Sequence, residues 1–183
     1  MNALLQPPDI LQFWFDELTN QQRFAIDAVM DAVVRERFGP ALLAAMRGEL
    51  FDWRVTAAGR LAEIILLDQF SRNVFRDTPA AFAQDAQALT LAQELVARGL
   101  DQSLSVEQRS FAYMPYMHSE SLLIHAQAVQ LFSLPGLENN LSFEMKHKAI
   151  IERFGRYPHR SGILKRESTT QELEFLTTPG SSF

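Results

Sequence analysis

The residues best suited to chemistry lie in the segment RFGRYPHRSGIL, residues 153–164, where three arginines and a histidine fall within eight positions. Arginine offers a planar, two-pronged set of donors that matches a carboxylate or a phosphate better than lysine does. Residues 141–166 carry seven of the 17 Lys and Arg but only two of the 22 Asp and Glu, whereas the whole chain has a formal net charge of -5. A basic segment on an acidic protein either pairs internally with carboxylates or faces an anion.

The backbone of this segment is predicted to leave a helix and to become extended. Gly155 is typical of a residue that ends a helix in the left-handed conformation, and Pro158 pushes Tyr157 toward extended geometry. In an extended strip Arg156 and Arg160 point to the same side. The sequence therefore predicts a short basic strip beyond a helix end.

A second set of charges lies in the otherwise apolar stretch LAEIILLDQFSRNVFR, residues 61–76. At helical spacing Asp68, Arg72 and Arg76 fall on one stripe, and the rest of the helix is apolar nearly all round, which predicts a buried central helix. Asp68 and Arg72 have the i, i+4 spacing of an ion pair, but Arg76 adds a cation that Asp68 alone cannot balance. The stripe is either a structural ion-pair row or one wall of a cleft.

Histidines occur on two further apolar faces. His118 and His125 share a face if their helix begins near Met117, and His147 lies among apolar residues of the segment SFEMKHKAIIERF. A histidine in such a place is more often a hydrogen-bonded core residue than a ligand. Seven residues of helix separate His118 from His125 by about 10 Å, too far for one ion, so we expect neither a metal nor another cofactor.

These residues are placed on a chain that reads as helix after helix, with no convincing strand. Helical spacing or clear end signals mark residues 8–18, 21–38, 40–50, 56–76, 79–98, 105–113, 117–133, 142–154 and 169–177. Ser105 is a predicted N-cap, and Gly39, Gly99 and Gly155 are predicted helix ends. Short connections favour antiparallel helix pairs in one all-α domain over residues 1–183, with a loose tail from about residue 178.

Composition narrows the classes of protein. The chain has no cysteine, which excludes disulfides and thiolate sites, and it shows neither a signal peptide nor an apolar run long enough to cross a membrane. We therefore expect a cytoplasmic protein without a membrane partner. A pI of about 5.4 argues against nucleic acid, and no P-loop, nucleophile elbow or metalloprotease helix is present.

Several phrases together resemble a bacterial family, domain of unknown function 924. They are FWF near the start, LLDQFSRNVFRDTPAAFAQDAQAL, YMPYMHSE and HKAIIERFGRYPHRSGILKREST, and they span about Ile10 to Leu176. The resemblance implies an all-helical, TPR-like fold, a bundle or short superhelix, and no assigned activity. The family pattern matches at Asp68, Gln69, Arg72, Asn73, Arg76, Asp85, Pro115, His118, Ser119, Glu120, His147, Arg153, Gly155, Arg156, Pro158, His159 and Arg160, and it departs at Ser71, Ser161 and Lys165.

We expect these polar residues to converge on one pocket that binds a small carboxylate or phosphate, and whether the protein is also an enzyme stays open. The candidate acids and bases are His118, Glu120, His147 and His159, and the candidate ligand-binding residues are Asp68, Arg72, Asn73, Arg76, Arg153, Arg156 and Arg160. The alternative is a TPR-like scaffold that binds a protein or peptide and whose charged network is structural. The sequence does not determine the oligomeric state.

Overall fold

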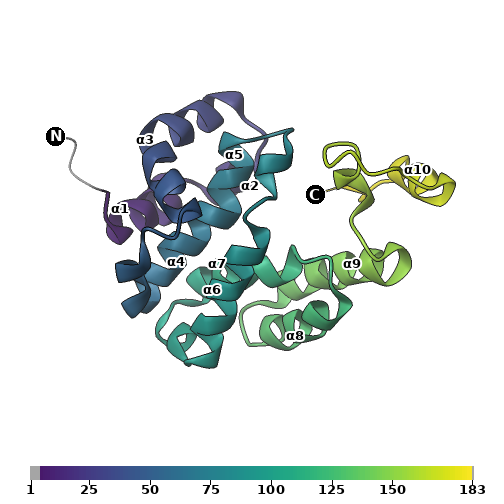
Figure 1. The fold of residues 1–183 in the computed structure, drawn as a ribbon. Helices are drawn as coiled ribbons and strands as arrows, with labels where there is room; N and C mark the ends of the chain where they lie inside the picture. The colour runs from purple at the N-terminus through teal and green to yellow at the C-terminus, as the bar shows by residue number, and fades with distance from the viewer. Residues whose placement is uncertain (1–4, 183) are drawn as a thin grey trace.

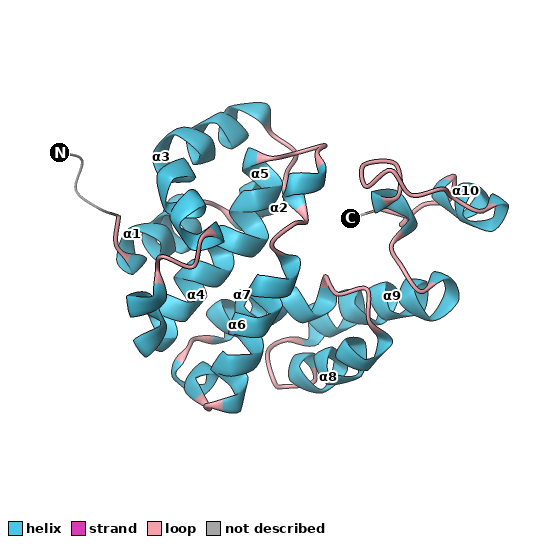
Figure 2. Cartoon of the chain, viewed as in Figure 1, coloured by secondary structure: helices cyan, strands magenta, loops and turns pink. Residues whose placement is uncertain are grey.

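The computed structural model describes residues 5–182, and within them the chain is all-α, with no strand (Figure 2). The α-helices are α1 (Pro7–Gln12), α2 (Asn20–Phe24), α3 (Ala28–Met46), α4 (Ala57–Ile65), α5 (Ser71–Val74), α6 (Asp85–Ala97), α7 (Val106–Met117), α8 (Leu122–Phe132), α9 (Glu138–Phe154) and α10 (Thr170–Leu176). Short 3-10 helices cover Phe51–Val55, Pro79–Ala81, Leu100–Ser103 and Pro158–Arg160, and π-helical turns cover Phe13–Glu17 and Leu66–Phe70. None of the helices in this part of the chain has the length and apolar character needed to cross a membrane.

The central element is the continuous run of α4, the π-helical turn and α5. Every residue from 59 to 71 is buried, as the apolar pattern predicts. A π-helical turn is wider than an α-helical one and often marks a functional site. Here it carries Asp68 and delivers Arg72 one turn later.

α1, α3, α6 and α7 pack against this run, and α8 and α9 extend from α7. α4 contacts α1, α6 and α7, while α8 packs against both α7 and α9 (Figure 1). The main core is built from residues of the N-terminal helices through α8. A smaller apolar cluster of Ile150, Ile151 and Tyr157, flanked by Phe154 and Phe175, joins α9 to the C-terminal segment that ends with α10.

The predicted break at Gly39 is wrong, because α3 runs through Gly39 and Pro40. Pro40 is exposed, so the carbonyl that loses its helical partner can bind water. The buried face continues across it from Phe38 to Leu42 at helical spacing. Packing of that face outweighs the local signals. The helix begins instead at Ala28, where the carboxylate of the N-cap residue Asp27 accepts hydrogen bonds from the amides of Val29 and Met30.

The helix predicted over residues 117–133 is present, but its predicted start is wrong. α7 continues past residue 113 to Met117, with His118 at its C-cap, and α8 begins only at Leu122. The Ser119 hydroxyl accepts the amide of Ser121, and the Ser119 carbonyl lies 2.9 Å from Nε2 of His125. This turn places His118 and His125 on different elements.

Helix caps are predicted more accurately. Ser105 caps α7 in a reciprocal pair with Gln108, and Gly99 and Gly155 have φ of 66° and 69° at the ends of their helices. At α10, where the spacing of Ser168 and Gln171 is typical of a capping box, the structure places the cap one position later, at Thr169 with Glu172.

Candidate functional site

The site begins with a buried carboxylate on the central helix. Asp68 is 0% exposed, and its Oδ1 lies 2.7 Å from Nδ1 of His118 and 3.2 Å from Nη1 of Arg72. Its other oxygen, Oδ2, accepts a 2.5 Å hydrogen bond from the Gln69 amide. Burial alone would raise the pKa of Asp68, but the charges of His118 and Arg72 hold that pKa well below its usual range. Asp68 is therefore a fixed negative charge beneath His118.

A second carboxylate, Asp85 at the start of α6, joins two arginines from distant segments. Arg72 donates to both of its oxygens, each at 3.1 Å, and Arg160 donates to Oδ2 at 3.1 Å. Asp68, Arg72, Asp85 and Arg160 thus form a row of alternating charges. The row connects the central helix to the C-terminal segment.

Aromatic rings hold the Arg160 guanidinium in place. Its central carbon lies 4.6 Å from the ring centre of Phe82 and 4.7 Å from that of Tyr157. Arg160 is only 6% exposed, and burial lowers the pKa of this arginine from its usual value. Stacked guanidinium groups keep their planar donors available at the edge.

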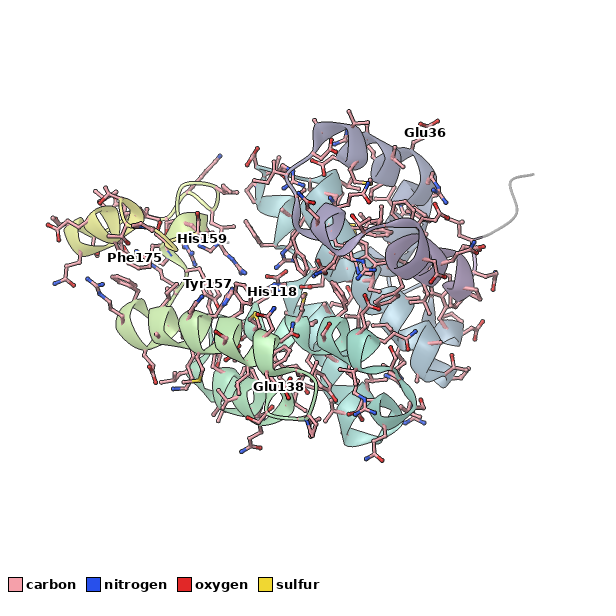
Figure 3. All side chains as sticks on the ribbon, turned by 180° about the vertical axis from the view of Figure 1, so that it is seen from behind. Glu36, His118, Glu138, Tyr157, His159 and Phe175 are labelled. Carbon is pink, nitrogen blue, oxygen red and sulfur yellow. The ribbon has the colours of Figure 1, made fainter. Side chains whose placement is uncertain are left out.

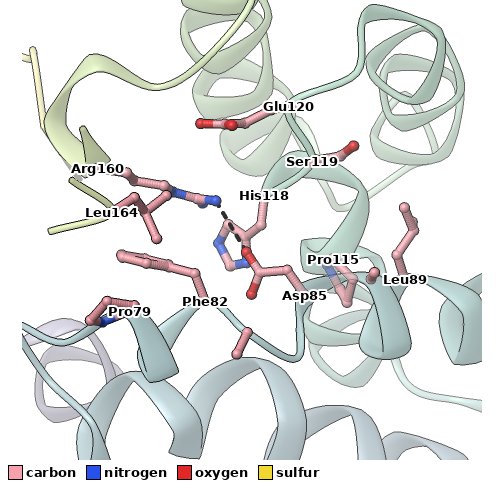
Figure 4. A pocket seen from close by; sticks show the side chains of 12 residues that line it. Pro79, Phe82, Asp85, Leu89, Pro115, His118, Ser119, Glu120, Arg160 and Leu164 are labelled. Atoms are coloured by element: carbon pink, nitrogen blue, oxygen red, sulfur yellow. Dashed lines mark hydrogen bonds and ion pairs between the residues drawn. The ribbon is translucent and has the colours of Figure 1, made fainter. Parts of the chain in front are cut away.

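Of these side chains, Phe82, Asp85, His118 and Arg160 border a pocket of about 370 Å³ (Figure 4). The expected ligand-binding residues Asp68 and Arg72 do not line it and contact it only through His118 and Asp85. The volume of the pocket falls in the range of small-molecule sites, about 300–1,000 Å³. The residues that line it come from segments 79–89, 115–120 and 160–164, and they are Pro79, Phe82, Ala83, Asp85, Ala86, Leu89, Pro115, His118, Ser119, Glu120, Arg160 and Leu164.

The hydrogen-bonding groups still open in this pocket are mainly donors. Within residues 5–182, one of the five side-chain N–H groups of Arg160 is used, by Asp85, and its Nε is buried without a partner. His118 uses Nδ1 toward Asp68, while its Nε2 has no hydrogen-bond partner in the same part of the chain. The carboxylate oxygens of Asp85, by contrast, are both occupied by arginine.

Glu120 is brought to the pocket but is held by the C-terminal segment. Arg166 donates to both of its oxygens, at 2.6 and 3.0 Å, and the Tyr157 amide donates to Oε1 at 2.8 Å. Burial would raise the pKa of Glu120, but these donors lower it. Its carboxylate is therefore occupied as an anchor for the segment and is poorly placed to accept a proton.

His159 lies beside Tyr157 (Figure 3), and the ring of His147 contacts that of Tyr157 from another side. Neither histidine lines the pocket. The Phe143 carbonyl accepts a hydrogen bond from Nδ1 of His147 at 2.8 Å. Burial lowers the pKa of His147 to about 3 and that of His159 to about 4. Both side chains are neutral at pH 7, so they cannot donate a catalytic proton there.

The remaining expected ligand-binding residues are directed elsewhere. Arg76 and Asn73 both donate to the Asp31 carboxylate on α3, with Arg76 at 2.6 and 2.7 Å and Asn73 at 2.8 Å. Arg153 is exposed, and its guanidinium lies over the ring of Phe154 at 4.6 Å. These three side chains do not line the pocket.

The predicted strip with Arg156 and Arg160 on one side is wrong, because Pro158–Arg160 forms a 3-10 turn. Arg156 turns away to Glu172 on α10, donating to its two oxygens at 2.6 and 2.7 Å. This pair lowers the pKa of Glu172 to about 2. Arg156 therefore fastens α10, while Arg160 alone reaches the pocket.

Asp85 is the residue that the predicted pocket lacked. The helix expected over residues 79–98 would place Asp85 inside the helix, away from its end. The chain instead forms a 3-10 turn at Pro79–Ala81, and α6 starts at Asp85. Its place in the phrase PAAFAQDAQAL of the resembled pattern was the one signal that could have found it.

Among the described residues no group of three or more His, Asp or Glu is placed to hold a metal ion.

Comparison with known proteins gives a family and a fold neighbour. Residues 10–180 match the model of a family described as bacterial protein of unknown function (DUF924). The structure is similar to that of the protein of unknown function ATU0120 from Agrobacterium tumefaciens, at 41% identity and a TM-score of 0.88, covering 93% of this chain and 96% of that one. No curated protein matches the chain.

Proposed function

The chain belongs to the DUF924 family of bacterial proteins, and we propose that it binds a small anion, a carboxylate or phosphate, between Arg160 and His118. The observation that carries the proposal is the surplus of open donors in a pocket whose nearest carboxylates are already paired. Partly buried guanidinium and imidazole donors are the groups that proteins use for such ligands.

The balance of charge around the pocket supports this choice. Asp68, Asp85 and Glu120 are matched by three arginines, Arg72, Arg160 and Arg166. A proton on His118 would give the site a net charge of about +1 at the place where its donors are open. An added cation would meet no unpaired carboxylate there.

The Asp68–His118 pair also suits acid–base chemistry. The ionised Asp68 carboxylate can only accept, so His118 donates Nδ1–H to it and turns Nε2 to the pocket. With a proton on Nε2 the ring donates to a bound anion, and after giving that proton up it can act as a base. A buried carboxylate that fixes the tautomer of a histidine is the arrangement of many general bases. In this proposal His118 is the proton carrier, and Glu120, His147 and His159 are not.

The test is thermal unfolding in phosphate or succinate against sodium chloride of equal ionic strength. At ten times Kd a ligand adds about 1.4 kcal/mol, which raises Tm by roughly 3–6 °C for a chain of this size. Arg160→Gln should abolish the rise and should fold, because Asp85 keeps both bonds from Arg72. Arg153→Gln, which removes the same charge outside the pocket, should keep it. Equal stabilisation of all three proteins would refute the site.

The alternative function is a scaffold that binds a protein or peptide, in a TPR-like array of antiparallel helix pairs. The observation in its favour is that α6, α7 and α8 each contact the next helix along the chain, as repeat arrays do. Leu123 on α8 is 73% exposed, which offers an apolar contact on that array. A scaffold predicts no anion response in the melting experiment and peptide binding that survives Arg160→Gln.

A further inference from the structure

The pocket combines a polar centre with apolar flanks. In Figure 4, Leu89 and Pro115 lie on one side of His118 and Asp85, while Pro79, Phe82 and Leu164 lie on the other. Seven of the 12 lining residues are apolar, including Ala83 and Ala86. An inorganic anion at Arg160 would leave these apolar surfaces in contact with water.

One apolar flank belongs to rigid helices. Ala86 and Leu89 are three residues apart on α6 and so share a face, and Pro115 lies on the neighbouring helix α7. Ala86 is exposed and Leu89 is half-buried. This flank, defined as Ala86, Leu89 and Pro115, lies next to Asp85. It is therefore also next to Arg160, where the anionic group would bind.

The charges of the site favour a single negative charge on the ligand. The three arginines Arg72, Arg160 and Arg166 are matched by Asp68, Asp85 and Glu120, so only a protonated His118 is left to neutralise an incoming anion. His147 and His159, the other histidines near Arg160, contribute no positive charge at pH 7, because burial lowers their pKa to about 3 and about 4. A dianionic phosphate would retain one uncompensated charge in a partly buried site.

We propose that the ligand is a monocarboxylic acid with an apolar body, whose carboxylate lies against Arg160 and His118 and whose body packs on the flank of Ala86, Leu89 and Pro115. This inference rests on the anion site proposed above and names its ligand class. The pocket of about 370 Å³ has room for such a body beside the head group.

The experiment is a calorimetric titration of the full chain with acetate, butanoate and hexanoate, and with hexan-1-ol and inorganic phosphate as head-group controls. Each buried methylene should tighten binding by up to about 4-fold. We expect hexanoate to bind at least about 10-fold more tightly than acetate and phosphate. Hexan-1-ol should bind more weakly than hexanoate by a similar factor, because it lacks the charge.

A matched pair of variants tests where the body lies. Ala86→Glu puts a charge on the proposed flank at an exposed helical position and should reduce the gain from acetate to hexanoate to less than about 3-fold. Ala97→Glu makes the same change at another exposed position of α6, away from the pocket, and should leave the gain intact. A gain that survives Ala86→Glu overturns the proposed placement.

The outcomes separate this inference from the function on which it rests. If acetate and phosphate bind the protein as tightly as hexanoate does, and this binding is lost in Arg160→Gln, the anion site is supported and the apolar-acid inference fails. If none of the anions shows binding that depends on Arg160, both fail. A peptide with a C-terminal leucine that binds at least about 10-fold more tightly than hexanoate would overturn the small-acid inference in favour of the scaffold.

Discussion

Replacing His147 should weaken the loss of stability that the protein suffers in mild acid. Burial lowers the pKa of His147 to about 3, whereas a histidine in an unfolded chain has a pKa of about 6.5. Between these values the unfolded chain binds a proton that the folded protein does not. The contribution of neutral, buried His147 to the free energy of unfolding is therefore complete above about pH 6.5, and it is lost as pH falls toward 3.

The magnitude follows from the interval of pH. At pH 5 the pH lies about 1.5 units below the pKa of a histidine in the unfolded chain, whereas native His147 is still neutral. This residue alone therefore lowers the free energy of unfolding by about 2 kcal/mol relative to pH 7.5. His159, whose pKa burial lowers to about 4, adds a similar loss. Wild-type protein should thus lose about 4 kcal/mol from the two histidines together.

Urea titrations of wild type and His147→Gln at pH 7.5 and pH 5.0 measure this difference. Glutamine can still donate to the Phe143 carbonyl that His147 contacts, and any general destabilisation cancels because each protein is compared with itself. The variant should lose about 2 kcal/mol less than wild type over the interval. Equal losses in the two proteins would refute the claim that His147 is kept neutral by burial.

Three further predictions concern stability and attachment. Gly59→Ala should destabilise by at least about 2 kcal/mol in urea, because a Cβ there would lie 2.0 Å from the Trp53 carbonyl oxygen; an unchanged midpoint would contradict this. Arg72→Ala should cost about 3 kcal/mol by the same assay, since it breaks two ion pairs of which that to Asp68 is buried. Arg156→Ala should speed hydrogen exchange in α10 while the anion-dependent rise in Tm persists. Loss of that rise would return Arg156 to the binding site.

Much of the fold and part of the site could be predicted because the signals are local. Apolar residues on every side of residues 61–70 require a buried helix, and the capping pair at Ser105 needs only neighbours three residues apart. The pairing of Asp68 with Arg72 likewise follows from helical spacing. Each of these depends on a pattern within one element.

The rest depends on contacts between segments that the sequence does not specify. No residue near Arg160 in the sequence indicates which carboxylate pairs with it. The partner, Asp85, lies 75 positions away. Arg156 and Arg160 look alike in sequence, but a 3-10 turn sends one to α10 and the other to the pocket. Pro40 is a strong local stop that the packing of α3 overrides.

The carboxylate shared by two arginines has a consequence for how this protein can change over evolutionary time. If either Arg72 or Arg160 is replaced, Asp85 keeps one cationic partner. If Asp85 is replaced first, Arg160 loses the carboxylate that pairs with it and is left beside the Arg72 guanidinium in a partly buried place, which destabilises the fold. A lineage can therefore lose Arg160 before Asp85 at little cost, whereas losing Asp85 first, or Arg72 with its buried pair to Asp68, passes through a destabilised intermediate. We expect substitutions at these three positions to be correlated and ordered among homologues.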